Sequence, residues 1–309
     1  MNPWNLRILE TPDEMRLVED LQRLVWPGDD TEIVPIHMLI AAVHGGGLVI
    51  GAYPSSQEQI NPLSGFVFGF PGYYKTPDGP RLMHCSHMLA VHPECRDQGL
   101  GFILKRAQWQ MVRRQEMDRM TWTYDPLQSR NAYLNIAKLG AVCNTYHREY
   151  YGEMRDGLNL GLPSDRFEVD WWINTTRVRR RVGAGVTPPS ARRRLDLAHY
   201  LEAGVQIINP SRSWFSQPFG TTGWPRPATS IQDWSRGKDG FDPILLMEIP
   251  NDFTLLRTTD FSLALEWRMH TRDLFEQLFT QGYLVTDFVH LPGTQPRSFY
   301  VLIYGESTL

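Results

Sequence analysis

A strand that runs directly into a glycine loop and then into a helix limits the possible folds more than any other feature of this chain. Residues 82–91 predict the strand, the stretch CRDQGLG at 95–101 predicts the loop, and apolar residues at helical spacing from Leu100 predict the helix. Backbone N–H groups at such a turn point into one concavity, next to the positive end of the helix dipole. The alternative is a purely structural turn, but the flanking strand and helix favour an anion site.

The spacing of the loop residues narrows the class of anion site. Arg96, Gly99 and Gly101 form the pattern R-x-x-G-x-G. This pattern is neither the dinucleotide fingerprint G-x-G-x-x-G nor a P-loop, which ends in Gly-Lys-Ser/Thr. We expect Arg96, with Lys105 or Arg106, to add positive charge at the rim of the loop. The pattern therefore predicts a diphosphate cradle of another kind.

The order of the other predicted elements indicates an α+β fold, a mixed and mostly antiparallel sheet flanked by helices. A capped helix, in which Thr11 and Glu14 form a capping box, is expected from residue 12, with Val18 and Leu21 on its apolar face. The remaining elements expected in the first half are strands at 46–53, 63–74 and 120–126, a helix at 129–140 and an extended run at 141–152.

The second half is expected to form a domain of its own. Residues 174–195 carry glycines, adjacent prolines and two arginine clusters without apolar periodicity, which is typical of a linker. We therefore expect domains at 1–173 and 196–309, with the role of the second unknown. A strand at 244–250, a helix at 260–281 and strands at 283–289 and 298–304 repeat the order seen after Leu82. This predicts a diverged half-repeat without the glycine loop.

Composition excludes several classes of protein. A formal net charge of −3 argues against a dedicated nucleic-acid binder. The three cysteines include no CxxC pair, so neither a disulfide framework nor a structural zinc site is expected. The amino terminus has no signal-peptide pattern, and no run approaches the ~20 apolar residues that span a bilayer. We expect a cytoplasmic protein without a membrane partner and without a metal.

The stretch LAVHPECRDQGLGFILKRAQ resembles the acyl-CoA-binding signature of the GNAT acetyltransferase superfamily. WTYDPLQSRNAYLNIAKLGA and YYGEMRDGLNLGLPSDRFEVDWW are similar to a largely uncharacterised bacterial GNAT-like group. The resemblance covers about the first half of the chain and implies acetyl-CoA or another acyl-CoA as cofactor. It implies that the strand pairs with the pantetheine arm and that the loop holds the diphosphate. The cofactor-binding residues expected are Leu89, Ala90, Val91, Arg96, Asp97, Gln98, Gly99, Leu100, Gly101, Asn131 and Asn135.

Catalysis of acyl transfer to an amine needs a base and an acid. The resemblance implies His87 as the base, because another GNAT branch has a histidine four residues before the position of Val91. A structural strand histidine is the alternative, and His84 is expected on the opposite face. GNAT enzymes often use a tyrosine as acid where this chain has Ile136. Tyr133, Tyr146 and Tyr150 are substitutes, and we assign Tyr150.

Polar residues near the strand ends are candidates for the acceptor site. Asp125 is assigned to it, although it can equally cap the following helix. Asp165 and Arg166 can orient an amino-acid acceptor through its carboxylate, with a surface ion pair as the alternative. Arg268 and Arg272 stand one helical turn apart and present donors either to an anion or, on a solvated helix face, to Glu266, Asp273 or Glu276.

These assignments predict an acyl-CoA-dependent N-acyltransferase that transfers an acetyl or succinyl group. The acceptor is a small amine or amino acid, which attacks the thioester directly. The alternative is a non-catalytic acyl-CoA-binding sensor or assembly protein on a degenerate GNAT fold. Acylation of protein or tRNA is a weaker third hypothesis, which the near-neutral charge opposes. Whether the protein forms a homodimer is left open by the sequence.

Overall fold

The computed structural model describes residues 3–28, 33–55, 63–152, 161–183, 195–211, 224–227 and 243–305. The chain divides into two compact units. Unit 1 comprises Met1–Trp122, Met154–Gly161 and Asp170–Thr175, and unit 2 comprises Thr123–Glu153, Leu162–Val169 and Thr176–Leu309. The domain limits expected at 174–195 stay a prediction.

Unit 1 contains a five-stranded sheet in the order β1-β2-β3-β4-β5. All neighbours are antiparallel except β4 and β5, which are parallel. The elements are β1 (Trp4–Ile8), α1 (Pro12–Val25), α2 (Ile36–His44), β2 (Leu48–Pro54), β3 (Gly65–Thr76), β4 (Gly79–Val91), the 3₁₀ turn η2 (Pro93–Cys95), α3 (Leu100–Arg114) and β5 (Arg119–Tyr124). The expected strand pair at 46–53 and 63–74 is confirmed as β2 and β3.

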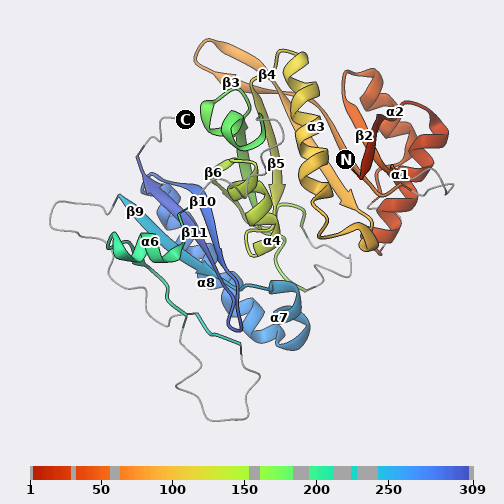
Figure 1. Cartoon of the computed structure of the whole chain (residues 1–309). Coiled ribbons are helices and arrows are strands. Elements are labelled where there is room, and N and C mark those ends of the chain that lie inside the picture. The colour runs from red at the N-terminus through yellow and green to blue at the C-terminus, as the bar shows by residue number, and fades with distance from the viewer. Residues whose placement is uncertain are drawn as a thin grey trace. The chain divides into compact units, whose positions relative to one another are not determined.

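Helices cover both faces of this sheet (Figure 1). Residues of α1 and α2, among them Met15, Val18 and Leu39, pack with Phe66 and Phe68 of β3 on one face. On the other face α3 lies against β3 and β4. A Cβ at Gly65 would approach the side chains of Leu100 and Leu104 to 3.2 Å, so the glycine permits this close packing.

The start of α1 follows the predicted capping box. The Glu14 N–H donates to Thr11 Oγ1 at 3.3 Å, and the Thr11 N–H donates to Glu14 Oε2 at 3.0 Å. These bonds satisfy backbone donors that a helix leaves unpaired at its start. The capping box is therefore confirmed.

Unit 2 holds the rest of the regular structure, except that the last three residues of β7 belong to unit 1. Its strand order continues from the end of β5 as β5-β7-β6-β10-β11-β9-β8. Its elements are α4 (Ser129–Ala132) and its π-helical continuation η3 (Tyr133–Lys138), β6 (Val142–His147), β7 (Arg166–Trp172), α5 (Thr176–Val178), the π-helical turn η4 (Arg179–Gly183), α6 (Leu197–Glu202), β8 (Gln206–Ile207), β9 (Ile244–Ile249), α7 (Phe253–Thr259), α8 (Phe261–Thr280), β10 (Tyr283–Leu291) and β11 (Arg297–Tyr304).

The strand order contains the same arrangement twice, and the first copy includes β4 and most of β5, which belong to unit 1. Helices connect β5 to β6, and the later β7 lies between those two strands. In the same way, helices connect β9 to β10, and the later β11 lies between them. Beside each set runs a parallel strand, β4 next to β5 and β8 next to β9. The half-repeat expected from the sequence matched residues 244–250 with the strand at 82–91, whereas this arrangement matches β9 with β5 and β8 with β4.

Part of the segment expected to be a linker is helical. Val178 and Val182 are buried, and Arg177 and Arg181 donate to backbone carbonyls of Gly140 and Ile136. Arg181 also pairs with Asp287 at 3.0 Å. The helix is favoured because these arginines satisfy carbonyl groups around the end of η3. Residues 184–194 lie outside the described residues.

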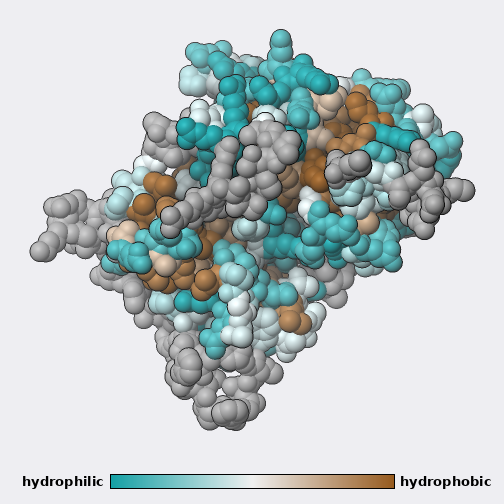
Figure 2. Space-filling view, in the orientation of Figure 1, coloured by the Kyte–Doolittle hydropathy of each residue, from teal (hydrophilic) through white to brown (hydrophobic). Residues whose placement is uncertain are grey.

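The expected α+β class, with a mixed and mostly antiparallel sheet and flanking helices, is confirmed. Within the described ranges, no helix combines the length and apolar character needed to cross a bilayer. Hydrophilic side chains predominate on the face shown in Figure 2, with apolar groups between α3 and α2 in unit 1 and over α6 and β9 in unit 2.

Candidate functional site

The glycine loop lies between β4 and α3, as predicted. Arg96, Asp97, Gln98 and Gly99 are exposed, and Gly99 has a φ of 78° at the N-cap of α3. Asp97 also has a positive φ, 63°. The N–H groups of Phe102 and Ile103 both donate to the Gly99 carbonyl and begin the helical ladder. The N–H groups from Gln98 to Gly101 precede that first turn, as those of an anion-binding helix start do.

Along its last residues, the strand before the loop pairs with a neighbouring strand on one edge and not on the other. Its pairing with β3 continues to Val91, through Ala90 and Leu89. In the described structure its parallel pairing with β5 consists of His84 with Met120 and Cys85 with Thr121. Between Ser86 and Val91, β4 therefore presents backbone groups that no β5 residue pairs with. An extended ligand can pair with such an edge as an added strand does.

His87 occupies a β-bulge in β4. Phe68 pairs with Met88 and Gly69 with Ser86, so His87 is the extra residue. Bulges often redirect a side chain beside an active site. The His87 ring lies 5.9 Å from the ring centroids of both Phe68 and Phe70. Although the side chain is exposed, desolvation beside these rings lowers its pKa, which favours the neutral form that a base requires.

Lys105 is not at the rim of the loop, where the sequence predicted it. It is buried and donates to Ser86 Oγ at 2.7 Å and to Gln108 Oε1 at 3.5 Å. Its Nζ also lies 3.5 Å from the centroid of the Trp122 ring. Burial lowers its pKa well below the ordinary value. The prediction named Lys105 or Arg106, and its Lys105 alternative was wrong because Lys105 falls on the sheet-facing side of α3, with Leu104 and Gln108.

His84 belongs to the same buried network. Its Nε2 lies 3.2 Å from Gln108 Nε2, and its Nδ1 is buried without a partner among the described residues. Burial, with the nearby charge of Lys105, lowers its pKa to about 3. His84 is therefore a neutral core residue, and its side chain lies away from the solvent-exposed His87.

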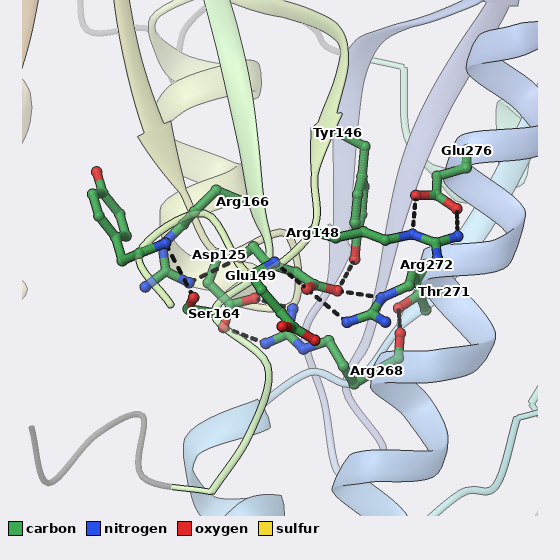
Figure 3. Close-up of polar contacts among 12 residues, drawn as sticks. Asp125, Tyr146, Arg148, Glu149, Ser164, Arg166, Arg268, Thr271, Arg272 and Glu276 are labelled. Carbon is green, nitrogen blue, oxygen red and sulfur yellow. Dashed lines mark hydrogen bonds and ion pairs between the residues drawn. The ribbon is translucent and has the colours of Figure 1, made fainter. Parts of the chain in front are cut away.

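A second group of polar residues, drawn in Figure 3, lies in unit 2. Arg268 of α8 donates to both oxygens of Asp125, at 2.8 and 2.5 Å. Arg272, one turn later, donates to both oxygens of Asp165, at 2.8 and 2.7 Å. Asp125 also caps the N–H of Leu127 at 2.9 Å. Neither reading left open for Arg268 and Arg272 is the one observed, because both arginines are buried and pair with Asp125 and Asp165 instead of with acidic residues of their own helix on a solvated face.

The other assigned residues of unit 2 differ in exposure. Arg166 is buried, donates to the Asp165 carbonyl at 2.8 Å, and lies over the Tyr151 ring at 5.4 Å. Tyr150 is exposed, with its ring 4.7 Å from that of His147. Asn131 is exposed on α4 and Asn135 is buried on η3. The roles assigned to these residues stay predictions.

No described group of three or more His, Cys, Asp or Glu side chains is placed to hold a metal ion. Within the same residues, Cys85, Cys95 and Cys143 form no disulfide. The expected absence of a metal stays a prediction.

Comparison with known proteins gives likenesses of fold. No protein-family model matches the chain, and no curated protein matches it. A putative acetyltransferase of Salmonella typhimurium with acetyl-CoA is 14% identical, with 57% of this chain and 98% of that chain covered and a TM-score of 0.41. NAA60 of Arabidopsis thaliana with acetyl-CoA is 14% identical, with 56% and 99% covered and a TM-score of 0.45.

A GNAT family acetyltransferase of Elizabethkingia anophelis with acetyl-CoA bound is 13% identical, with 56% of this chain and 99% of that chain covered and a TM-score of 0.40. Over this part the structure resembles GNAT acetyltransferases. The likeness is distant. The reaction of this chain therefore has to be argued from its own residues.

Sequence reasoning missed the network of Lys105, Ser86, Gln108 and Trp122. One signal was present, because Lys105 and Gln108 share a helical face with Leu104, Trp109 and Val112, which are all buried. The apolar residues that follow Leu100 at helical spacing are Ile103, Leu104, Ala107 and Met111, and only Leu104 of these is fully buried. The buried face of α3 therefore differs from the face that the spacing predicted. A charged residue within an apolar stripe marks a position that packing alone does not explain.

Proposed function

We propose that this protein is an acyl-CoA-dependent N-acyltransferase that transfers an acetyl or succinyl group to a small amine or amino acid. The observation that carries the proposal is the β4 edge, which is unpaired with β5 from Ser86 to Val91 and leads into an exposed glycine loop at the start of α3. An extended arm along the strand and a diphosphate at the helix start fit this geometry together.

The loop residues Arg96 to Gly101 would hold the diphosphate of the coenzyme. Their backbone N–H groups and the dipole of α3 favour a negative charge, and the exposed Arg96 adds a cation. Leu89, Ala90 and Val91 would offer backbone groups to the pantetheine arm. Space is available at the loop, because a Cβ at Gly99 would meet no atom within 4 Å.

The reaction would be direct attack of the amine on the thioester. The amine nitrogen bonds to the carbonyl carbon, the carbon–sulfur bond breaks, and the electron pair goes to sulfur as a thiolate. His87, kept neutral by its lowered pKa, takes the proton that the attacking nitrogen loses. Tyr150, the acid assigned from the sequence, belongs to unit 2 and stays a prediction.

Asp125, Asp165 and Arg166 stay the residues proposed to recognise the acceptor. Their existing contacts restrict how the two carboxylates can do so. Both carboxylates are engaged by arginines of α8, so they act on an acceptor only through that pairing. Arg166 offers its cation for an acceptor carboxylate.

Calorimetry with CoA and acetyl-CoA tests binding, and a matched pair of glycine variants localises it. Gly99→Ala and Gly204→Ala introduce a Cβ at the same φ of 78°, and each Cβ meets nothing within 4 Å. We expect Gly99→Ala to weaken CoA binding about tenfold, because the strained loop no longer aligns its N–H groups. Gly204→Ala should bind normally. Absence of CoA binding by the unaltered protein would overturn the proposal.

Thioester consumption with a panel of amines tests catalysis. We expect turnover, and His87→Ala should lower kcat by about 10²-fold while CoA binding persists. His37→Ala, which changes an exposed histidine on α2, is the control. Tight CoA binding without turnover on any amine would support the alternative, a non-catalytic acyl-CoA-binding protein.

A further inference from the structure

A buried amine lies where β4 and β5 stop pairing. The last parallel pair joins Cys85 to Thr121, and the next residue on each strand is Ser86 and Trp122. Lys105 Nζ contacts both of them, at 2.7 Å from Ser86 Oγ and 3.5 Å from the Trp122 ring centroid. The amine therefore lies at the closed end of the unpaired edge of β4, on the side of α3.

The surroundings of this amine suit an ammonium group that lacks a permanent counterion. Its three N–H bonds match three acceptors, which are Ser86 Oγ, Gln108 Oε1 and the face of Trp122. No carboxylate pairs with Lys105 among the described residues, which is unusual for a buried lysine. A leucine or methionine would fill the same space without the desolvation cost. An anion placed beside this amine would favour its charged form, which burial alone disfavours.

The proposed coenzyme site places such an anion at this position. If the diphosphate lies at the glycine loop, the pantetheine arm runs back along β4 from Val91 towards Ser86. These five residues span roughly 17 Å of extended strand. The sulfur at the end of the arm would then lie at Ser86, and it becomes a thiolate when the acyl group leaves. This step of the argument depends on the proposed function.

We propose that Lys105, acting through the hydroxyl of Ser86, stabilises and protonates the thiolate that leaves the acyl-CoA. The carbon–sulfur bond breaks with its electron pair on sulfur. The Ser86 hydroxyl, which donates to Gln108 Oε1 at 2.8 Å in this structure, turns to the sulfur and gives it the proton, and the Lys105 ammonium gives a proton to the Ser86 oxygen. Lys105 regains a proton from solvent after the product leaves. Ser86 is the catalytic residue in this step, and Lys105 is the positioning residue behind it.

The electrostatics of the network favour this direction of proton transfer. Burial lowers the pKa of Lys105, so the ammonium releases its proton more easily than an exposed lysine does. The titratable group that faces the network from β4 is His84, and the facing residues of α3 and β5, Gln108 and Trp122, do not titrate. His84, with its pKa of about 3, stays neutral across the working range. The assignment supplies an acid where Ile136 replaces the expected tyrosine, and it takes the place of Tyr150 in this step.

The test compares the affinity for CoA with the affinity for desulfo-CoA, which lacks the sulfur. We expect the unaltered protein to prefer CoA by about tenfold at about pH 8.5, because a charge-assisted contact to the thiolate contributes to binding. This preference should decline at lower pH, where bound CoA is a thiol. Lys105→Met should bind both ligands equally. Lys75→Met, which changes an exposed lysine of β3, should keep the preference.

The outcomes separate this proposal from the proposed function. If no form of the protein binds either ligand, the proposed function fails. If Lys105→Met and the unaltered protein show the same preference at every pH, this inference fails while CoA binding stands. Should Lys105→Met not fold, Lys105→Gln keeps a donor to Ser86 without the charge, and we expect it to lose the preference as well. A preference retained by Lys105→Gln overturns the role of the charge.

Discussion

Arg272 and Asp165 form a two-pronged ion pair inside unit 2. Nε and Nη2 of Arg272 donate to the two carboxylate oxygens at 2.8 and 2.7 Å, and both residues are buried. The Tyr146 hydroxyl donates to Asp165 at 2.7 Å, and the N–H of Glu149 donates at 3.1 Å. The carboxylate therefore has four donors. This pairing ties α8 to the loop before β7.

Removing the cation of this pair should destabilise the protein strongly. Arg272→Met leaves the Asp165 carboxylate buried without a counterion, so we expect the free energy of unfolding to fall by about 3–5 kcal/mol. Urea denaturation followed by circular dichroism measures the change. Arg148→Met is the control, because Arg148 pairs with Glu276 of the same helix but is largely exposed. A similar loss in both variants would contradict the role of burial.

The buried His84 should make stability depend on pH in an unusual range. Burial holds its folded pKa at about 3, below the ordinary value of 6.5. Between these values the unfolded chain binds a proton that the folded chain does not, so stability falls as pH decreases from 6.5 towards 3. The slope is about 1.4 kcal/mol per pH unit from this group. His84→Leu should remove this component from urea midpoints measured across that range. An unchanged slope would show that His84 is not its source.

Gly69 should tolerate no larger side chain. A Cβ at this position would lie 2.6 Å from the Cys85 carbonyl oxygen and would also collide with His84 Nε2. We expect Gly69→Ala to lower the free energy of unfolding by about 1–3 kcal/mol, since β3 has to shift away from β4. Gly45→Ala, where the nearest atoms lie at 3.4 Å, should change it much less. Thermal denaturation of the two variants compares their losses of stability, and equal losses would contradict the expectation for Gly69.

The main elements of the fold were predictable where local signals agreed. The capping box of Thr11 and Glu14 placed α1, and continuous apolar runs placed β3, β4, β9 and β11. The strands β1, β7 and β8 were missed. The β7 sequence RFEVDWW alternates polar and apolar residues from Arg166 to Trp171, and burial alternates in the same way from Phe167, so a local signal for this strand was present and was overlooked.

The candidate site was likewise predictable where its signals are local and not where they depend on distant contacts. The loop at 95–101 was readable because glycine spacing and the flanking elements are local properties. The contacts of Asp165 with Arg272, and of Lys105 with Trp122, join residues far apart in the sequence, so periodicity did not place them. The unpaired edge of β4 depends on where two parallel strands separate, which no local pattern encodes.

Charge at the loop should contribute to CoA binding in a way that salt reveals. Arg96 is exposed beside the proposed diphosphate site, so Arg96→Ala should raise the Kd for CoA about tenfold at low ionic strength. The difference should shrink in about 0.5 M salt, where exposed charges are screened within a few ångströms. Arg114→Ala, at the opposite end of α3, should leave Kd unchanged because the diphosphate would lie at the helix start. Calorimetry at two salt concentrations makes the comparison, and equal Kd values for Arg96→Ala and the unaltered protein would remove Arg96 from the site.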